Sequence, residues 1–307
     1  MATAPATIRK NQATLGADEK RRLVAALLAV KKSGRYDDYV RIHLNMGQMH
    51  HTGPKRGQRK VPPRGMAGMG SMGQMIHGNP TFLPWHRELL RRLELDLQAV
   101  DSSVAIPYWN WAVDDSPTSS LWRPDFLGAD GREADRRVMD GPFAYDAGRW
   151  TLKYNQHPEP DLKRAFAVDA TVLPSAAEVR ACLGETPYDA APWDTSSRPS
   201  FRNRLEGWID APAGQEVGMH DLVHVWVGGT MSYMSSPNDP VFFLHHANID
   251  RLWAQWQQAH QGLDYAPARG GPEGENRGDA LDPWGAPATI ASVLDHRALG
   301  YRYDDEG

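Results

Sequence analysis

Histidines at metal-ligand spacing are the residues of this 307-residue chain with the clearest chemical potential. Seven of the twelve histidines lie on or just before stretches with helical apolar spacing, one group before residue 90 and another after residue 219. His220 and His224 stand four residues apart in GMHDLVHVWV, so a helix would place both imidazoles on one face. A single such histidine is more often a satisfied polar residue near a core than a ligand. Two groups together indicate metal binding.

The all-histidine composition of the two groups narrows the choice of metal. Imidazole suits copper, zinc, iron and nickel, but neither group has the Glu-x-x-His spacing of di-iron bundles or the His-Glu-x-x-His spacing of zinc proteases. The only cysteine, Cys182, excludes an intrachain disulfide framework and any multi-cysteine metal site. Two groups of three histidines would suit a coupled pair of coppers that binds O2, because neutral imidazoles leave Cu(I) electron-rich and three ligands leave coordination positions open.

Helices must position these histidines, and apolar periodicity predicts three of them in the first third of the chain. The first covers 17–33. The second begins after the acidic pair at 37–38 and carries His43 on its inner face. The third follows Pro84 and aligns His86 with a stripe of leucines, which is the pattern of a core-facing helix side.

Two further helices are predicted near the end of the chain. One is GMHDLVHVWV, and the other opens at the Asn-Asp-Pro sequence that starts at residue 238 and supplies His245 and His246. Between 107 and about 214, frequent Pro, Gly, Asp and Ser predict short helices joined by long loops. We therefore expect a mainly α fold with little sheet, as a single domain over 1–307.

Composition excludes several classes of function. The formal charge is −4 and no long basic run occurs, so we expect neither a nucleic acid nor an anionic membrane as partner. No run of 18 apolar residues occurs, and the N-terminus lacks the apolar core of a secretory signal. These features predict a soluble, cytoplasmic protein, unless a partner exports it.

The chain resembles the type 3 copper proteins, specifically the short bacterial tyrosinases and the related o-aminophenol oxidases. The likeness runs from about Ile8 to His260 and rests on IRKNQATL, SGRYDDYV, FLPWHRELL, IPYWNW, LWRPDFLG, RVMDGPFA, FRNRLEGW, HVWVGG and SPNDPVFFLHH. It implies a four-helix bundle core around two copper ions, with no organic cofactor. It also implies three histidine ligands for each copper: His43, His77 and His86 for the first, and His220, His224 and His246 for the second.

The resemblance leaves open which histidine is the third ligand of the second copper, and it points to two carboxylates as candidate catalytic residues. His245 is interpreted as a neighbour of the second copper, although either histidine of the pair His245 and His246 could be the ligand. Glu206 in RLEGW matches the glutamate that orients a water beside the coppers in family members that deprotonate monophenols. Asp221, directly after His220, stands where tyrosinases with strong monophenolase activity carry asparagine.

These carboxylates suggest the reaction. A carboxylate at 221 can accept a hydrogen bond from an ortho amino group, so we expect O2-dependent oxidation of o-aminophenols and o-diphenols to o-quinone imines and o-quinones. The alternative is a true tyrosinase that hydroxylates monophenols and oxidises catechols, with Asp221 only a solvated helix residue. An O2 carrier or a copper-storage protein is a further alternative. Carriers of this family cover the dicopper site with additional protein, and the 47 residues after His260 are too few for a sandwich domain of about 100 residues.

A methionine- and glycine-rich insertion at about 47–76 separates the first two predicted ligands. It repeats methionine at every third position, at Met66, Met69, Met72 and Met75, and also contains His50 and His51. Thioethers favour Cu(I), which suggests transient copper binding and transfer to the first site. A lid or a partner-docking loop is the alternative. The resemblance also implies a possible partner, because related bacterial enzymes receive their copper from a separate small protein, called a caddie protein.

Overall fold

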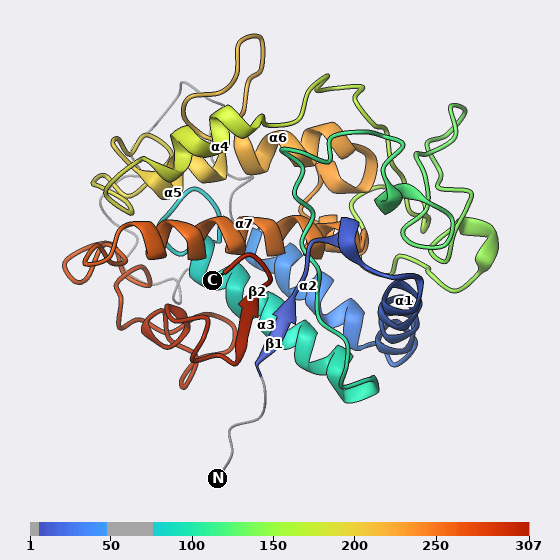
Figure 1. Ribbon diagram of the computed structural model, residues 1–307, viewed down its shortest axis with the longest axis horizontal. Coiled ribbons are helices and arrows are strands. Elements are labelled where there is room, and N and C mark those ends of the chain that lie inside the picture. The colour runs from blue at the N-terminus through green and yellow to red at the C-terminus, as the bar shows by residue number, and fades with distance from the viewer. Residues whose placement is uncertain (1–5, 48–75, 307) are drawn as a thin grey trace, which may run out of the picture.

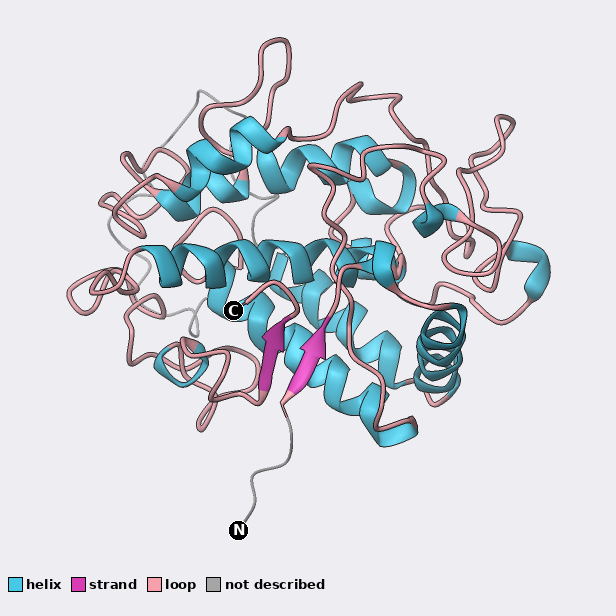
Figure 2. Ribbon diagram, in the orientation of Figure 1, coloured by secondary structure: helices cyan, strands magenta, loops and turns pink. Residues whose placement is uncertain are grey.

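Seven α-helices and one two-stranded sheet make up the regular structure of residues 6–47 and 76–306, which this computed structural model describes (Figure 1 and Figure 2). The helices are α1 (Ala17–Lys32), α2 (Arg35–Gly47), α3 (Phe82–Val100), α4 (Ala176–Leu183), α5 (Phe201–Glu206), α6 (Met219–Val227) and α7 (Val241–Ala259). The strands are β1 (Thr7–Arg9) and β2 (Tyr301–Tyr303). Short 3-10 helices lie at Gln12–Thr14, Ser120–Trp122, Tyr145–Ala147, Gly229–Ser232, Ser236–Asn238 and Ala291–Val293.

The five predicted helices are present, and their ends differ slightly from the predictions. α2 begins at Arg35, so the acidic pair at 37–38 lies in its first turn, where it faces the positive end of the helix dipole, instead of capping it. α3 begins at Phe82 and includes Pro84 in its first turn, where a proline costs no intrahelical hydrogen bond. The region from 107 to 214 holds only short helices and long loops, as predicted.

The long helix α7 occupies the centre of the molecule. Figure 1 shows α7 crossing the middle, with α2 and α3 on one side and α5 and α6 on the other. Most of its residues from Val241 to Trp256 are buried, and it packs on α3, α4 and α6. Buried apolar side chains form one cluster from Leu23 to Tyr303, and the assignment of 1–307 to a single domain stays a prediction. No helix of the described residues is long and apolar enough to cross a bilayer.

The insertion at about 47–76 lies, apart from its two end residues, outside the described residues. The proposed copper transfer by Met66, Met69, Met72, Met75, His50 and His51, and the alternative of a lid or docking loop, therefore stay predictions.

A buried ionic network joins both ends of the chain to the core helices. β1 and β2 pair in parallel, with Arg9 opposite Tyr303. Asp250 of α7 accepts hydrogen bonds from Arg9 at 3.2 Å, from Arg87 of α3 at 2.5 Å, and from the hydroxyls of Tyr301 and Tyr303 at 2.6 and 2.5 Å. Burial alone would raise the pKa of Asp250, but Arg87, Arg9 and the two hydroxyls outweigh it and lower the pKa to about 2. The network therefore fixes α3 against α7.

Replacing Asp250 with asparagine is expected to destabilise the fold in a pH-dependent way. Removing one partner of a buried ion pair costs about 3 kcal/mol in the free energy of unfolding at neutral pH. Because the pKa of Asp250 is lower in the folded state, its contribution is complete above about pH 4 and falls as the pH drops toward 2. The difference in the free energy of unfolding between wild type and Asp250→Asn should therefore decrease by about 2 kcal/mol from about pH 4 to pH 2.

Urea titrations at several pH values measure this difference. Asp305→Asn is the control, because Asp305 is a more exposed partner of Arg251. Its effect should stay below about 1 kcal/mol. A difference for Asp250→Asn that does not change with pH would contradict the assigned pKa.

Candidate metal centre

Two clusters of histidines meet where α2, α3, α6 and α7 approach one another. The first consists of His43, His77 and His86, and the second of His220, His224, His245 and His246. Within each cluster, one ligating nitrogen from each ring lies within 4.8 Å of the others. The rings of His86 and His246 stack at 4.3 Å, so the two clusters are adjacent. The structure thus brings together all seven histidines that the sequence pattern singled out.

Backbone carbonyls fix the tautomer of three of these rings. The Nδ1 atoms of His43, His86 and His224 lie 2.7, 2.8 and 2.8 Å from carbonyl oxygens. Because a carbonyl only accepts, Nδ1 must donate, and the neutral ring keeps its lone pair on Nε2. The Nε2 atoms of all three rings are buried and have no hydrogen-bond partner among the described residues.

The loop that follows α6 forms hydrogen bonds with one histidine of each cluster. The carbonyl of Met234 accepts from His43 of the first cluster, and the carbonyl of Met231 accepts from His224 of the second. Four residues of backbone therefore orient one ring of each cluster, so the separation of the two rings depends on the conformation of this loop.

Burial keeps the rings neutral. It lowers the pKa of His43, His220 and His224 to about 3, and it also lowers the pKa of His86 and His246 well below the ordinary value. An unpartnered buried nitrogen costs about 1–3 kcal/mol, and a metal ion that accepts the lone pairs would remove this cost. Neutral nitrogen donors without carboxylate in the clusters fit copper.

Trp111 distinguishes between the adjacent His245 and His246. The indole nitrogen of Trp111 donates to Nδ1 of His245 at 3.2 Å. Since an indole N–H can only donate, the proton of the neutral His245 ring lies on Nε2, which then has no lone pair for a metal. The Nε2 of His246 lies 3.3 Å from the Nε2 of His220, so these two nitrogens converge. We therefore propose His246 as the third ligand of the second cluster.

Asp221 lies beside the second cluster, and its catalytic role stays a prediction. Its Oδ1 lies 2.8 Å from Nδ1 of His220, and its side chain is 23% exposed. The carboxylate accepts, so Nδ1 of His220 donates and Nε2 keeps its lone pair. A carboxylate bound to a ligand imidazole fixes the ring and makes it a stronger donor.

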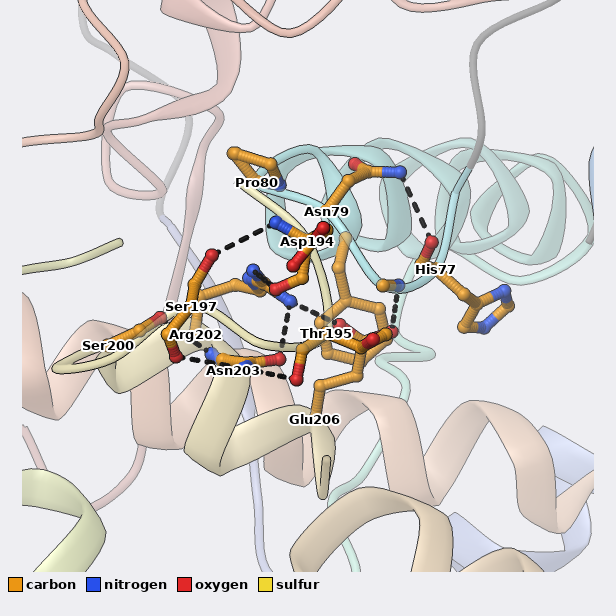
Figure 3. Close-up of polar contacts among 12 residues, drawn as sticks. His77, Asn79, Pro80, Asp194, Thr195, Ser197, Ser200, Arg202, Asn203 and Glu206 are labelled. Carbon is orange, nitrogen blue, oxygen red and sulfur yellow. Dashed lines mark hydrogen bonds and ion pairs between the residues drawn. The ribbon is translucent and has the colours of Figure 1, made fainter. Parts of the chain in front are cut away.

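Glu206 lies behind His77 and is fully buried (Figure 3). One carboxylate oxygen accepts from the amide of Gly78 at 2.5 Å, and the other accepts from Arg202 at 3.0 Å. Burial raises the pKa of Glu206 to about 7; Arg202 opposes the rise, and the nearby Asp221 adds to it. Its assignment as the residue that orients a water stays a prediction.

A cavity of about 440 Å³ opens onto the two clusters. Its polar surface includes Asp221 and four histidines, His43, His77, His220 and His224. Its apolar wall consists of Trp208, Val217, Val225, Met231, Tyr233 and Met234. A cavity of this size and composition accommodates a small aromatic molecule against the histidines. Glu206 is not among the described residues that line it.

The sequence analysis did not identify the wall of this cavity or Arg202. Trp208 is exposed to 40% and Tyr233 to 43%, although both line the cavity. Trp208 follows Glu206 by two residues in the RLEGW motif, and this proximity in sequence could have indicated that Trp208 lies near the site. Tyr233 lies in the loop that orients His43 and His224, a role that no sequence pattern indicates.

Comparison with known proteins gives consistent matches over nearly the whole chain. Residues 33–259 match the common central domain of tyrosinase. The chain is 47% identical to a tyrosinase of Streptomyces glaucescens over 98% of this chain and 100% of that protein. It is 38% identical to grixazone synthase of Streptomyces griseus over 97% of this chain and 99% of that protein. A solved polyphenol oxidase variant from Thermothelomyces thermophila shares the fold, with a TM-score of 0.67 at 23% identity, over 97% of this chain and 88% of that one.

Removing one proposed ligand from either cluster is expected to remove one copper. His86→Ala should lose the first copper and His224→Ala the second, because two remaining imidazoles hold the ion far less tightly. Copper analysis of the purified, copper-loaded variants measures this. His245→Gln is the matched control and should keep two coppers, because its ring has no lone pair facing the cluster. Two coppers in either alanine variant would contradict the ligand assignment.

Proposed function

Because the chain belongs to the tyrosinase family of dicopper phenol oxidases, we propose that it uses O2 to oxidise o-aminophenols and o-diphenols. Two substrate molecules each lose two electrons and two protons to become an o-quinone imine or an o-quinone. One O2 accepts the four electrons and four protons and becomes two waters. The copper ions are the cofactors of this family, and they supply the electron exchange with O2 and an electrophilic template for the substrate oxygen.

The protein would bind the substrate ring in the cavity beside the clusters. Trp208, Val217 and Tyr233 offer apolar and aromatic contacts to the two faces of a ring. The proposed ligands His43, His77 and His86 would hold one ion, and His220, His224 and His246 would hold the other. The cavity is lined by four of these six rings, two from each proposed ligand set.

Asp221 is the observation that favours an ortho amino group on the substrate. Among the described residues that line the cavity, Asp221 is the one carboxylate, and it lies next to the proposed ligand His220. A carboxylate has about four acceptor sites, so Asp221 can bind His220 and still accept from a substrate N–H. We propose that Asp221 also receives one of the two protons that each substrate molecule loses, with Glu206 as a second carboxylate behind the site.

A true tyrosinase is the second candidate, and sequence identity favours it. The chain shares 47% of its residues with the Streptomyces glaucescens tyrosinase and 38% with grixazone synthase. Hydroxylation of a monophenol requires a base, because a free phenol has a pKa of about 10. In this candidate a water oriented by Glu206 would take the proton of the phenol, and Asp221 would be a solvated helix residue.

Initial rates on three substrates distinguish the candidates. The apoprotein is loaded with copper and then assayed with tyrosine, a catechol and a 2-aminophenol at equal concentration. We expect the 2-aminophenol and the catechol to react much faster than tyrosine. Tyrosine turnover as fast as either would make the protein an ordinary tyrosinase. No turnover of any of them, with reversible O2 binding intact, would indicate an O2 carrier.

Asp221→Asn is expected to shift this preference. A hydrogen bond to a charged group contributes about 1.5–3 kcal/mol, so its loss should lower kcat/KM for the 2-aminophenol by roughly tenfold or more. Tyrosine oxidation should rise relative to wild type, because the asparagine restores the residue type of strong monophenolases. Asp210→Asn is the control, since Asp210 forms a partly exposed ion pair with Arg198 outside the cavity. Equal effects on both substrates would contradict the proposed role.

We also propose that a copper-loading caddie protein contacts the rim of the cavity. Trp208 and Tyr233 are exposed aromatic side chains beside the proposed ligands, and aromatic residues of this kind are enriched at protein interfaces. The site of action of the protein, which we expect to be the cytoplasm, and the role of the methionine-rich insertion stay predictions.

A further inference from the structure

His77 is the proposed ligand that no helix positions. The other five lie on α2, α3, α6 and α7, where the backbone hydrogen bonds of each helix fix the local conformation of the ligand that it carries. His77 lies in an irregular segment, 76–81, that leads into α3. Within this segment the side-chain amide of Asn79 donates to the carbonyl of His77 at 3.2 Å, and contacts from elsewhere in the chain hold the segment against α5.

Two side chains from the region of α5 bind the backbone just after His77. A carboxylate oxygen of Glu206 accepts from the amide of Gly78 at 2.5 Å, and the hydroxyl of Tyr188 donates to the carbonyl of Pro80 at 2.7 Å. Gly78 has a φ of 72°, a left-handed conformation that suits glycine and turns the chain toward α3. Figure 3 shows α5 with Glu206 lying against the segment of His77 and Pro80.

Arg202 in turn holds Glu206. Its Nη1 donates to the second carboxylate oxygen of Glu206 at 3.0 Å, and its Nε donates to Asp189 at 2.9 Å. Further bonds go to the carbonyl of Asp194 at 3.1 Å and to the side chain of Asn203 at 2.9 Å (Figure 3). Arg202 and Glu206 are fully buried. The guanidinium thus fixes the Glu206 side chain in a single orientation.

We propose that Arg202 and Tyr188 are positioning residues for the first copper, acting through Glu206 and Pro80 on the segment that carries His77. This inference rests on the proposed copper ligands and deepens that assignment. Among the contacts of the described residues, Arg202 reaches no proposed ligand and does not line the cavity. Its side chain can act on the segment of His77 through Glu206, and also through Asp189, the chain neighbour of Tyr188.

Copper release tests the proposal without relying on activity. The copper-loaded protein is reduced and mixed with excess Cu(I) chelator, and the two release phases are timed. The phase that is absent from His86→Ala identifies the first copper. Arg202→Gln should speed that phase by tenfold or more and leave the other within twofold, because loss of a group that orients a ligand typically weakens metal affinity 10–100-fold. Tyr188→Phe should speed the same phase by less.

Arg204→Gln is the matched control. Arg204 lies on the same helix, two residues from Arg202, and pairs with Glu185 instead of Glu206. It should change neither phase, and thermal unfolding of each variant shows whether the fold is retained. If Arg202→Gln does not fold because two buried carboxylates lose their partner, Tyr188→Phe decides, since it removes one hydroxyl and keeps the ring.

Two results would overturn the proposal. Unchanged release of the first copper in Tyr188→Phe and in folded Arg202→Gln would show that the segment needs no such support. Equal acceleration of both phases would show a general loss of stability instead of a local role. If wild type itself holds fewer than two coppers, the copper site on which the proposal depends is wrong, and this outcome is seen before any variant is made.

Discussion

Buried imidazole nitrogens without a hydrogen-bond partner are the constraint on which the site depends. The Nδ1 atoms of His43, His86 and His224 donate to carbonyls, which leaves their Nε2 lone pairs buried and without a hydrogen-bond partner among the described residues. Such an arrangement is unfavourable in an empty protein and favourable around a metal. Folding therefore prepares a binding site at a cost in stability, and copper binding recovers that cost.

The rest of the structure resists the collapse of this site. Asp250, with Arg9 and Arg87, holds α3 against α7 from behind the clusters, and the two terminal strands complete this network. On the opposite side of α7, α5 and α6 pack together. Glu206 binds the backbone amide of Gly78, next to His77, and Asp221 lies beside the ring of His220. The Asp250 network and the two carboxylates on the other side of α7 are all buried or half-buried charged groups. Such groups add little net stability, but they tolerate only one geometry.

Sequence reasoning predicted the helices because their apolar residues repeat with the helical period, and it placed His43, His86, His220 and His224 on them. The resemblance was needed for His77, since no periodicity marks an irregular segment. The pairing of β1 with β2 was not predicted, because three-residue strands at opposite ends of the chain carry no local signal. The proposal of His246 over His245 rests on the contact of Trp111 with His245, which is distant in sequence and carries no local signal.

The central claim is that two histidine clusters hold a pair of copper ions. Crystallography of the copper-loaded protein with anomalous scattering at the copper absorption edge tests it most directly. The account predicts two peaks about 3.5–4 Å apart, as in other two-metal sites, one among His43, His77 and His86 and the other among His220, His224 and His246. A single peak, or a second peak bound by His245 in place of His246, would contradict it.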